Sequence, residues 1–510
     1  MRLTKWLLMV LAASMLFIAC NRTEPSKHDE AREGTTHVSV SLAFQSAFRA
    51  TEDQEHNGIG DWGGRDEIKT IDVFILSRGT NVIQHFQEKT VKTAANFSKD
   101  GVYSLKPWKT TPGNKVVYVV VNGETEVING LKQATVENFT TKYAEALTLV
   151  GSQGVDGKYA KTEGNKDVIM MTGASALVNV VDGVTEAQAL AGSNTARVSV
   201  RRIAALVSVT MNKELHDQLT NGVEVKADAS SSSGAAVTIG RLKNLKWTVA
   251  QYEKKSKLFE AGTTFADIKS PSFDYVTADG NQYNEGTDQA KNNYDYSLLK
   301  SGFDLASFSR SSDNKANVQS IVGGTMKFIT ETTHKYGSTE AETNYRRGNT
   351  AYIMVTGTFI PEQSAMATGE GSYTEGHDLY WGTIDGKFYT SEENAKKKNP
   401  VVAGTSRDGV IKFKGGKMYY FAWLNPDKIE PTKWLNSPVL RNNLYHVNVS
   451  RFGKLGFSGN PYNPGKDPED DPDPDDPTPD PKDPINEKET YMTTEVTVIN
   501  WGAHSYDVKF

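Results

Sequence analysis

The alternation of apolar and polar residues predicts β structure for most of the chain. Val38, Val40, Leu42 and Phe44 alternate with small or polar residues, which is the period of a half-buried strand. Other runs rich in Val, Ile, Tyr, Phe and Thr, bounded by Gly, Asn, Pro and Ser, predict further strands. These runs cover residues 68–76, 115–121, 197–211, 245–251, 350–360 and 418–423.

Helical spacing is clear only once. Apolar residues between Leu131 and Val150 recur three or four positions apart and predict a helix, and residues 185–191 show a weaker helical pattern. Many strands, few helices and no repeated βαβ order favour antiparallel β-sandwiches. Because a single core stops growing at about 250–300 residues, a chain of 510 residues is expected to form at least two domains. We expect their boundary near residues 212–240, around a stretch of small residues.

The first twenty residues have the pattern of an export signal. Arg2 and Lys5 precede an apolar run at residues 6–18, which is shorter than the about 20 residues that span a bilayer. The run ends at Ala19-Cys20, and Cys20 is the only cysteine of the chain. A small residue before such a cysteine resembles a bacterial lipobox, in which the thiol is acylated. The alternative is an ordinary secretory signal with an incidental cysteine.

The C-terminal segment combines a Pro/Asp-rich run with an isolated strand. Nine of the 24 residues from Pro461 to Pro484 are proline, which predicts an extended, self-repelling segment. Beyond it, residues 491–501 alternate as a strand does, and the alternation resumes from His504 to Phe510. A strand of this kind has to pair with a sheet edge or a groove.

Charge and motifs exclude several functions. The net charge is −5, and residues 466–484 alone carry nine acidic side chains against two lysines, so the remainder is close to neutral. A nucleic-acid binder would carry a basic face, and no local run provides one. We find no metal-ligand spacing, no cofactor motif and no catalytic constellation. The aromatic run at residues 419–423 could line a sugar-binding platform, but a buried strand is the favoured interpretation.

The two ends of the chain suggest a mode of assembly. The N-terminal strand precedes an Arg49-Ala50 bond in polar sequence, where proteases cut. If that strand fills a groove in its own sheet, its removal lets the C-terminal strand of a neighbouring copy fill the groove by β-augmentation. Such a contact does not close, so it propagates a filament. The alternative is that the C-terminal strand folds back onto its own domain, and the residues alone leave both possibilities open.

Several long motifs indicate a family. They are densest in YRRGNTAY (345–352), YYFAWLNP (419–426), WLNSPVLRNNLYHV (434–447) and KLGF (454–457). They continue in Gly60-Asp61-Trp62, the Phe48-Arg49-Ala50 site, the Pro/Asp segment and the C-terminal strand. Together these motifs closely resemble the Bacteroidales fimbrillins, or type V pilins, and in particular the stalk subunits of minor (short) fimbriae.

The resemblance implies a structural subunit of the minor fimbrial stalk, without enzymatic activity, cofactor or metal. The expected precursor is a lipoprotein, attached to the outer membrane through Cys20 and cleaved between Arg49 and Ala50 by an arginine-specific protease. Its expected partners are other copies of itself, anchor and tip subunits, and host and bacterial surface receptors, but not nucleic acid. The implied roles of the fimbria at the cell surface are adhesion and biofilm formation.

The expected division of the chain into segments and domains follows from this resemblance together with the patterns above. It comprises a lipoprotein signal peptide (1–20), a propeptide with a removable strand (21–49), transthyretin-like β-sandwiches (50–215 and 216–460), a Pro/Asp linker (461–486) and a donor strand (487–510). The removable strand presents Val38, Val40, Leu42 and Phe44, and the donor strand Val496, Val498, Ile499, Trp501, Tyr506, Val508 and Phe510.

Two other functions would leave the lipid on Cys20, namely a surface glycan-binding lipoprotein that uses the aromatic strands and a fimbrial anchor. A fimbrial tip subunit would need no donor strand, and a hydrolase is the last alternative. The N-terminus of the mature protein distinguishes the stalk subunit from the lipid-retaining alternatives.

Overall fold

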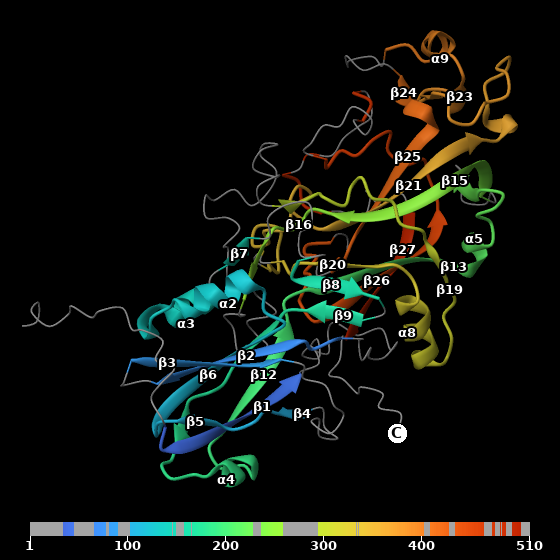
Figure 1. Cartoon of the computed structure of the whole chain (residues 1–510). Coiled ribbons are helices and arrows are strands. Elements are labelled where there is room, and N and C mark those ends of the chain that lie inside the picture. The colour runs from blue at the N-terminus through green and yellow to red at the C-terminus, as the bar shows by residue number, and fades with distance from the viewer. Residues whose placement is uncertain are drawn as a thin grey trace, which may run out of the picture.

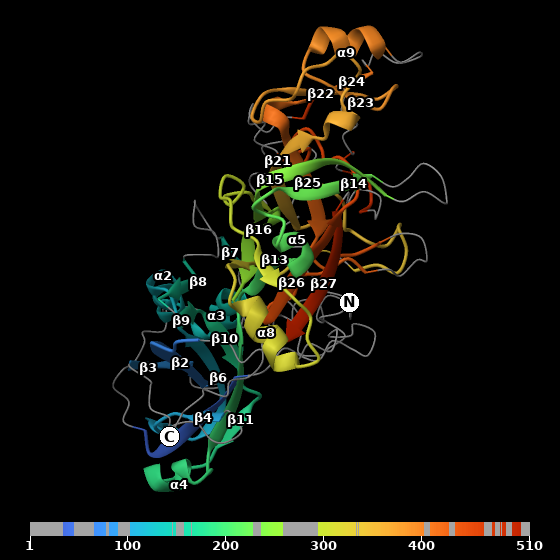
Figure 2. The ribbon, with the colours of Figure 1, turned by 90° about the vertical axis from the view of Figure 1, so that its right-hand side faces the viewer.

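The computed structural model describes residues 34–44, 66–77, 81–89, 102–144, 146–148, 158–164, 166–227, 236–258, 294–332, 334, 336–401, 409–427, 434–463, 472–474, 480, 482–485 and 492–500. The described chain is mostly β, as predicted, and its strands form two large sheets and several small ones. We refer to residues 34–204 as the N-terminal half and to residues 205–500 as the C-terminal half. The two halves lie end to end (Figures 1 and 2).

The first large sheet belongs to the N-terminal half and has the order β3-β2-β6-β10-β12-β1-β4, with β11 beside β6 and β5 beside β1. All its pairs are antiparallel except β1 with β12. Its strands are β1 (Thr36–Phe44), β2 (Thr70–Ser77), β3 (Val82–Lys89), β4 (Val102–Ser104), β5 (Trp108–Thr110), β6 (Gly113–Val121), β10 (Met171–Ala174), β11 (Val178–Val180) and β12 (Thr195–Arg202).

The second large sheet has the order β19-β13-β26-β14-β15-β21-β25, with β20 beside β13 and β27 beside β26. Its strands are β13 (Ala205–Asn212), β14 (Val223–Ala227), β15 (Val237–Ala250), β19 (Ala306–Phe308), β20 (Met326–Ile329), β21 (Tyr352–Pro361), β25 (Lys417–Trp423), β26 (Asn443–Phe452) and β27 (Met492–Asn500).

Small sheets and short helices complete the described chain. A three-stranded sheet of β22 (Leu379–Gly382), β23 (Lys387–Tyr389) and β24 (Val410–Phe413) lies with α9 (Glu392–Lys398) at the far end of the C-terminal half (Figures 1 and 2). The two-stranded sheets are β8 (Ala160–Glu163) with β9 (Lys166–Ile169), β7 (Ala146–Thr148) with β17 (Lys255–Lys257), and β16 (Tyr252–Glu253) with β18 (Tyr294–Asp295). The other helices are α2 (Thr125–Lys132), α3 (Val136–Ala144), α4 (Glu186–Leu190), α5 (Lys213–His216), α8 (Asn314–Val322), η3 (Gln363–Ala365) and η4 (Lys414–Gly416).

Most of the expected elements are present, with two corrections. The single helix expected over 131–150 is wrong, because α2 and α3 are separate helices and Leu147 lies in β7. The run 197–211 forms two strands, since the chain leaves the first sheet at Arg202 and enters the second at Ala205. Strand β13 therefore pairs within the second sheet. The expected domain boundary at residue 215 would instead place this strand in the N-terminal domain.

The central strands of the first sheet are covered on both faces. One face of β2 and β6 packs in a cluster with the buried side chains of β1 and β12. On the other face, Phe74 packs against Phe139 of α3 with ring centroids 5.2 Å apart, and Tyr118 packs against Tyr143 at 4.8 Å. Burial on both faces explains why β2 and β6 are continuous apolar runs rather than alternating ones.

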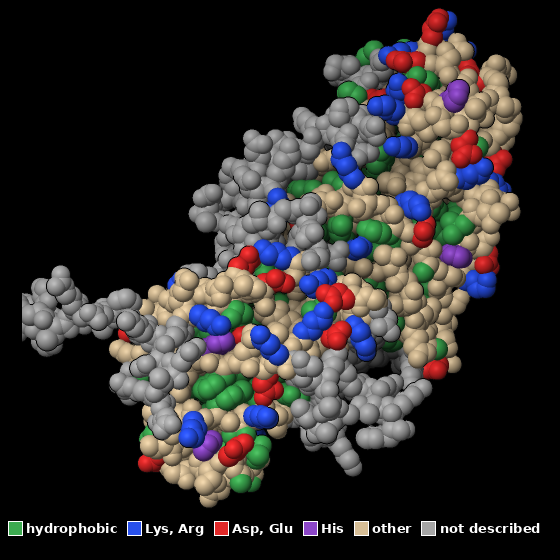
Figure 3. Space-filling view, viewed as in Figure 1, with side chains coloured by type: hydrophobic (Ala, Val, Ile, Leu, Met, Phe, Trp, Pro, Cys, Tyr) green, Lys and Arg blue, Asp and Glu red, His purple; other side chains and the backbone are tan. Residues whose placement is uncertain are grey.

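Charged side chains of both signs are interspersed on the face shown in Figure 3. None of the described helices is long and apolar enough to cross a membrane. The described residues also contain no group of three or more His, Cys, Asp or Glu side chains placed to bind a metal ion.

Candidate functional site: the groove of strand β1 and the C-terminal segment

Strand β1 lies inside the first sheet and is paired along both of its edges. Its residues from Ser39 to Phe44 run parallel to β12, opposite Thr195 to Val200. Its other edge is antiparallel to β4 at residues 41–43 and to β5 at residues 36–38. Without β1, the sheet would therefore have a gap with an unpaired edge on each side.

The side chains of β1 fill that gap. Val38, Val40 and Leu42 are each 0% exposed and pack in one cluster with apolar residues of β2, β6 and β12. At about 1.5–3 kcal/mol for each fully buried side chain, the three contribute on the order of 5–9 kcal/mol. The side chain of Phe44, the fourth residue expected on this face, lies outside the described residues.

Polar contacts fix the beginning of β1 against the turn that precedes α4 and the residues that follow this helix. The Thr36 hydroxyl donates to the Val181 carbonyl at 2.7 Å, and the His37 amide donates to the Val184 carbonyl at 3.0 Å. The side-chain amide of Asn194 donates to the His37 carbonyl at 3.0 Å. These bonds set the register of β1.

The expected processing sites lie outside the described residues. These are Cys20, Arg49 and Ala50. Strand β1 ends at Phe44, five positions before Arg49 in the sequence. A cut after Arg49 would therefore leave β1 attached to the rest of the chain by non-covalent contacts alone.

The C-terminal strand β27 pairs with β26 of its own chain. The pairing is antiparallel, and Val447 faces Val496, Tyr445 faces Val498 and Leu444 faces Ile499. Within the described residues the strand thus occupies the fold-back position, which was one of the two expected possibilities. The other expected donor residues, Trp501, Tyr506, Val508 and Phe510, lie outside the described residues.

Strand β26, the partner of β27, carries a fully buried histidine. Burial lowers the pKa of His446 to about 3, so this side chain is neutral at physiological pH. Its Nε2 atom lies 2.7 Å from Oγ1 of Thr210 on β13. His446 thus ties β26 to β13, on the opposite edge from β27.

The Pro/Asp segment contacts the C-terminal half at three described places. Near its start, the ring of Tyr462 is 2% exposed. In its middle, the Asp473 carboxylate accepts a hydrogen bond from the Lys412 amide of β24 at 2.8 Å. Near its end, Asp483 forms an ion pair with Arg347 at 2.8 Å, and Ile485 is 0% exposed. The expectation of a segment extended by self-repulsion is wrong at these places, because each is fixed by protein contacts.

The aromatic run 419–423 forms strand β25 and is buried, as the favoured interpretation predicted. Tyr420 and Ala422 face the main core of the C-terminal half, whereas Tyr419, Phe421 and Trp423 face the opposite way. This second face is covered by Phe457, Tyr462 and Ile485. The aromatic rings therefore form the docking surface of the Pro/Asp segment rather than an open platform.

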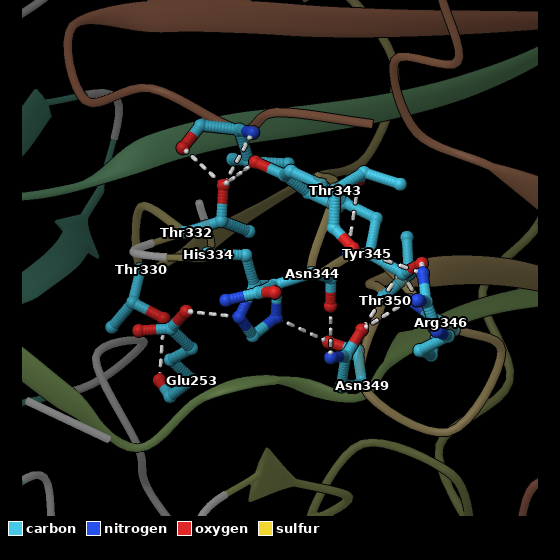
Figure 4. A network of polar contacts seen from close by, with 11 residues as sticks. Glu253, Thr330, Thr332, His334, Thr343, Asn344, Tyr345, Arg346, Asn349 and Thr350 are labelled. Carbon is cyan, nitrogen blue, oxygen red and sulfur yellow. Dashed lines mark hydrogen bonds and ion pairs between the residues drawn. The ribbon is translucent and has the colours of Figure 1, made fainter. Parts of the chain in front are cut away.

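A buried polar network lies beside this surface and fixes the loop at residues 343–350 (Figure 4). Asn349 accepts from the Arg346 amide at 2.8 Å through its side chain and donates to the Asn344 carbonyl at 2.7 Å. His334 Nε2 donates to the Asn349 carbonyl at 2.8 Å, and the Glu253 carboxylate lies 3.7 Å from Nδ1 of the same imidazole. The motif YRRGNTAY supplies much of this network, and it contains Arg347.

A second buried polar group joins the two halves. The Arg202 guanidinium forms an ion pair with Asp66, and its Nε lies 3.2 Å from the carboxylate. The Arg202 amide donates to the side-chain carbonyl of Asn442 at 3.0 Å. Arg202 and Asp66 are only 2% and 1% exposed, so this contact is desolvated. No charge pattern in the sequence indicated the pairing, because its members are more than a hundred positions apart.

An N-terminal strand buried inside one large sheet and a C-terminal strand paired with a second large sheet define a two-sheet β protein. Residues 411–507 match the family model described as "Major fimbrial subunit protein type IV, Fimbrillin, C-terminal". Over 529 aligned residues the chain is 33% identical to the minor fimbrium subunit Mfa1 of Porphyromonas gingivalis, with both chains covered completely. The chain therefore belongs to the fimbrillin family of fimbrial subunits.

The chain also has some similarity to solved structures of fimbrial proteins of Porphyromonas gingivalis. A fimbrilin (FimA) matches with a TM-score of 0.40 and 13% identity, covering 92% of this chain and 99% of that chain. The tip fimbrial protein Mfa3 matches with a TM-score of 0.38 and 10% identity, covering 91% and 100%. By family, the protein is a structural subunit of a cell-surface fimbria.

Proposed function

We propose that this protein is a stalk subunit of a minor fimbria that polymerises by strand exchange. The precursor is exported as a lipoprotein on Cys20, and an arginine-specific protease cuts it between Arg49 and Ala50. Strand β1 then leaves together with the lipid, and the C-terminal strand of a neighbouring copy fills the open groove. The observation that carries this proposal is the two-sided pairing of β1 around three fully buried side chains.

A comparison of the two positions of the C-terminal strand supports the direction of the exchange. On its own subunit, β27 pairs with the single strand β26 among the described residues. The groove of β1 offers backbone partners on both edges and apolar pockets between them. The groove thus forms twelve residue pairs with β1, against nine between β26 and β27, and each backbone hydrogen bond contributes about 0.5–1.5 kcal/mol net. β27 and β1 also have the same length of nine residues.

The assembled stalk carries the biological role. Its partners are other copies of the chain, a fimbrial anchor and tip subunits, in line with the fimbrial relatives. The stalk extends from the outer membrane and supports adhesion to host cells and other bacteria, and biofilm formation.

Two variants test the proposal. Deletion of residues 491–510 should leave both halves folded and secreted but abolish polymers, because no donor strand remains. Replacement of Arg49 by Ala should leave a lipidated monomeric precursor on the cell surface. Normal filaments from the deletion variant, or filaments with Cys20 still attached from the Arg49→Ala variant, would refute strand exchange after cleavage.

A further inference from the structure

The end of the Pro/Asp segment is fixed to its own subunit by several independent contacts. Arg347 Nη1 lies 2.8 Å from an Asp483 carboxylate oxygen, and the Arg347 amide donates to the Asp483 carbonyl at 3.0 Å. The side chain of Asp483 is half-exposed, whereas that of Arg347 is largely buried. Two positions further on, Ile485 is 0% exposed within the aromatic cluster.

The partner surface for this end is rigid. The Arg347 carbonyl accepts from the Gln251 side chain at 2.6 Å, and Gln251 also donates to the Thr350 carbonyl at 2.8 Å. The Thr350 hydroxyl donates to the Arg346 carbonyl at 2.7 Å, which closes the loop around Arg347 (Figure 4). Hydrogen bonds between buried groups restrain the residues that they join. These hydrogen bonds hold the loop, and with it Arg347, in one conformation.

The start of the Pro/Asp segment is equally well packed. The Tyr462 ring lies 5.2 Å from that of Phe421, 5.4 Å from that of Tyr352 and 5.7 Å from that of Trp423, measured between centroids. The Asn460 side-chain amide donates to the Tyr352 hydroxyl at 3.0 Å. If the segment left the domain, this aromatic surface would be exposed to water over a large apolar area.

We infer that the Pro/Asp segment stays on its own subunit up to Ile485 during polymerisation, and that only the residues after Ile485 cross to the neighbour. This inference rests on the proposed strand exchange and locates the hinge of the donated strand. Ile485 and the Arg347–Asp483 pair then act as positioning residues, since they fix the point from which the donor strand leaves.

The location of the hinge sets the distance between subunits. A segment freed from Pro461 to Pro484 would have a reach of about 75 Å at roughly 3.1 Å per residue. With Ile485 fixed, Met492 can lie at most about 24 Å away, because seven residues span about 3.4 Å each. The groove of the neighbour must therefore begin close to the aromatic cluster of the donor. Adjacent subunits consequently touch and form a stiff stalk, rather than beads on long tethers.

Two engineered disulfides test the inference. The first pair, Arg347→Cys with Asp483→Cys, joins positions already linked by a backbone hydrogen bond, and it locks the segment to its own subunit. The second pair, Asn443→Cys with Asn500→Cys, joins opposite residues of β26 and β27 and locks the C-terminal strand in place. Each full-length variant is produced in the native bacterium, and its filaments are quantified by electron microscopy and polymer yield, with and without reductant. The reduced form of each variant is its own control for folding.

The expected results differ between the two pairs. The oxidised 347–483 pair should give polymer yields within twofold of its reduced form, whereas the oxidised 443–500 pair should give none until reductant is added. If the 347–483 bridge blocks polymerisation and reductant restores it, the segment has to leave its subunit, and the inference is overturned. If the 443–500 bridge does not block polymerisation, the C-terminal strand is not donated, and the proposed function itself fails.

Discussion

Shortening a buried side chain of β1 should accelerate polymerisation after cleavage. Leu42 is 0% exposed in the groove, and Leu→Ala substitutions at such sites cost about 2–5 kcal/mol. After a cut at Arg49 this loss falls on the non-covalent contacts that keep β1 in its groove. If release of β1 limits the exchange, the lower figure of about 2 kcal/mol corresponds to an about 30-fold faster release.

The assay follows polymer formation by light scattering after an arginine-specific protease is added to precursor that lacks the lipid. The Leu42→Ala variant should polymerise with a shorter lag than the unmodified precursor at equal extents of cleavage. Ser41→Ala is the matched control, because Ser41 lies on the opposite face of β1 and outside the apolar cluster. Equal lags for Leu42→Ala and the unmodified precursor, after complete cleavage of both, would refute the account of β1 as the element that blocks assembly.

Three further predictions concern buried polar groups. The pKa of His446 is about 3 in the folded protein, below its ordinary value of 6.5. Between these pH values only the unfolded chain binds this proton, so the free energy of unfolding falls by about 1.4 kcal/mol for each unit by which the pH is lowered. Chemical denaturation measures the free energy of unfolding at pH 7.5 and at pH 4.5. The decrease between these two pH values should be about 2.5 kcal/mol smaller for His446→Gln than for the unmodified protein. Arg202→Met should cost roughly 3–5 kcal/mol by leaving the Asp66 carboxylate buried, and adding Asp66→Leu should recover most of this loss in the same denaturation experiment. Tyr143→Phe removes the hydroxyl that donates to the Val119 carbonyl at 2.6 Å, so thermal melting should show a loss of about 1–3 kcal/mol.

Local patterns were sufficient to predict several of the apolar strands and the burial of β25, because side chains alternate within one strand whatever its partners are, but they did not predict β26. The alternation around Val40 predicted β1 directly. The break between β12 and β13 was not predicted, since valines and other strand-forming residues occur on both sides of Ile203. That break depends on Arg202 meeting Asp66 and Asn442, which are distant in sequence.

The docking of the Pro/Asp segment was also missed, although the sequence contains a signal for it. Proline and aspartate dominate the segment and suggest an exposed chain, but Tyr462 and Ile485 are isolated apolar residues at its two ends. Such residues in a polar segment favour attachment to a folded surface. The surface itself is the outer face of β25, which explains why this strand is aromatic on both faces.

The measurement that tests the central claim most directly is the N-terminal sequence and intact mass of the protein sheared from the cell surface as fimbriae. Strand exchange predicts a chain that begins at Ala50, without the lipid and without β1. A chain that begins at an acylated Cys20 would still contain β1 in its groove. That result would contradict polymerisation by strand exchange and favour an anchored lipoprotein.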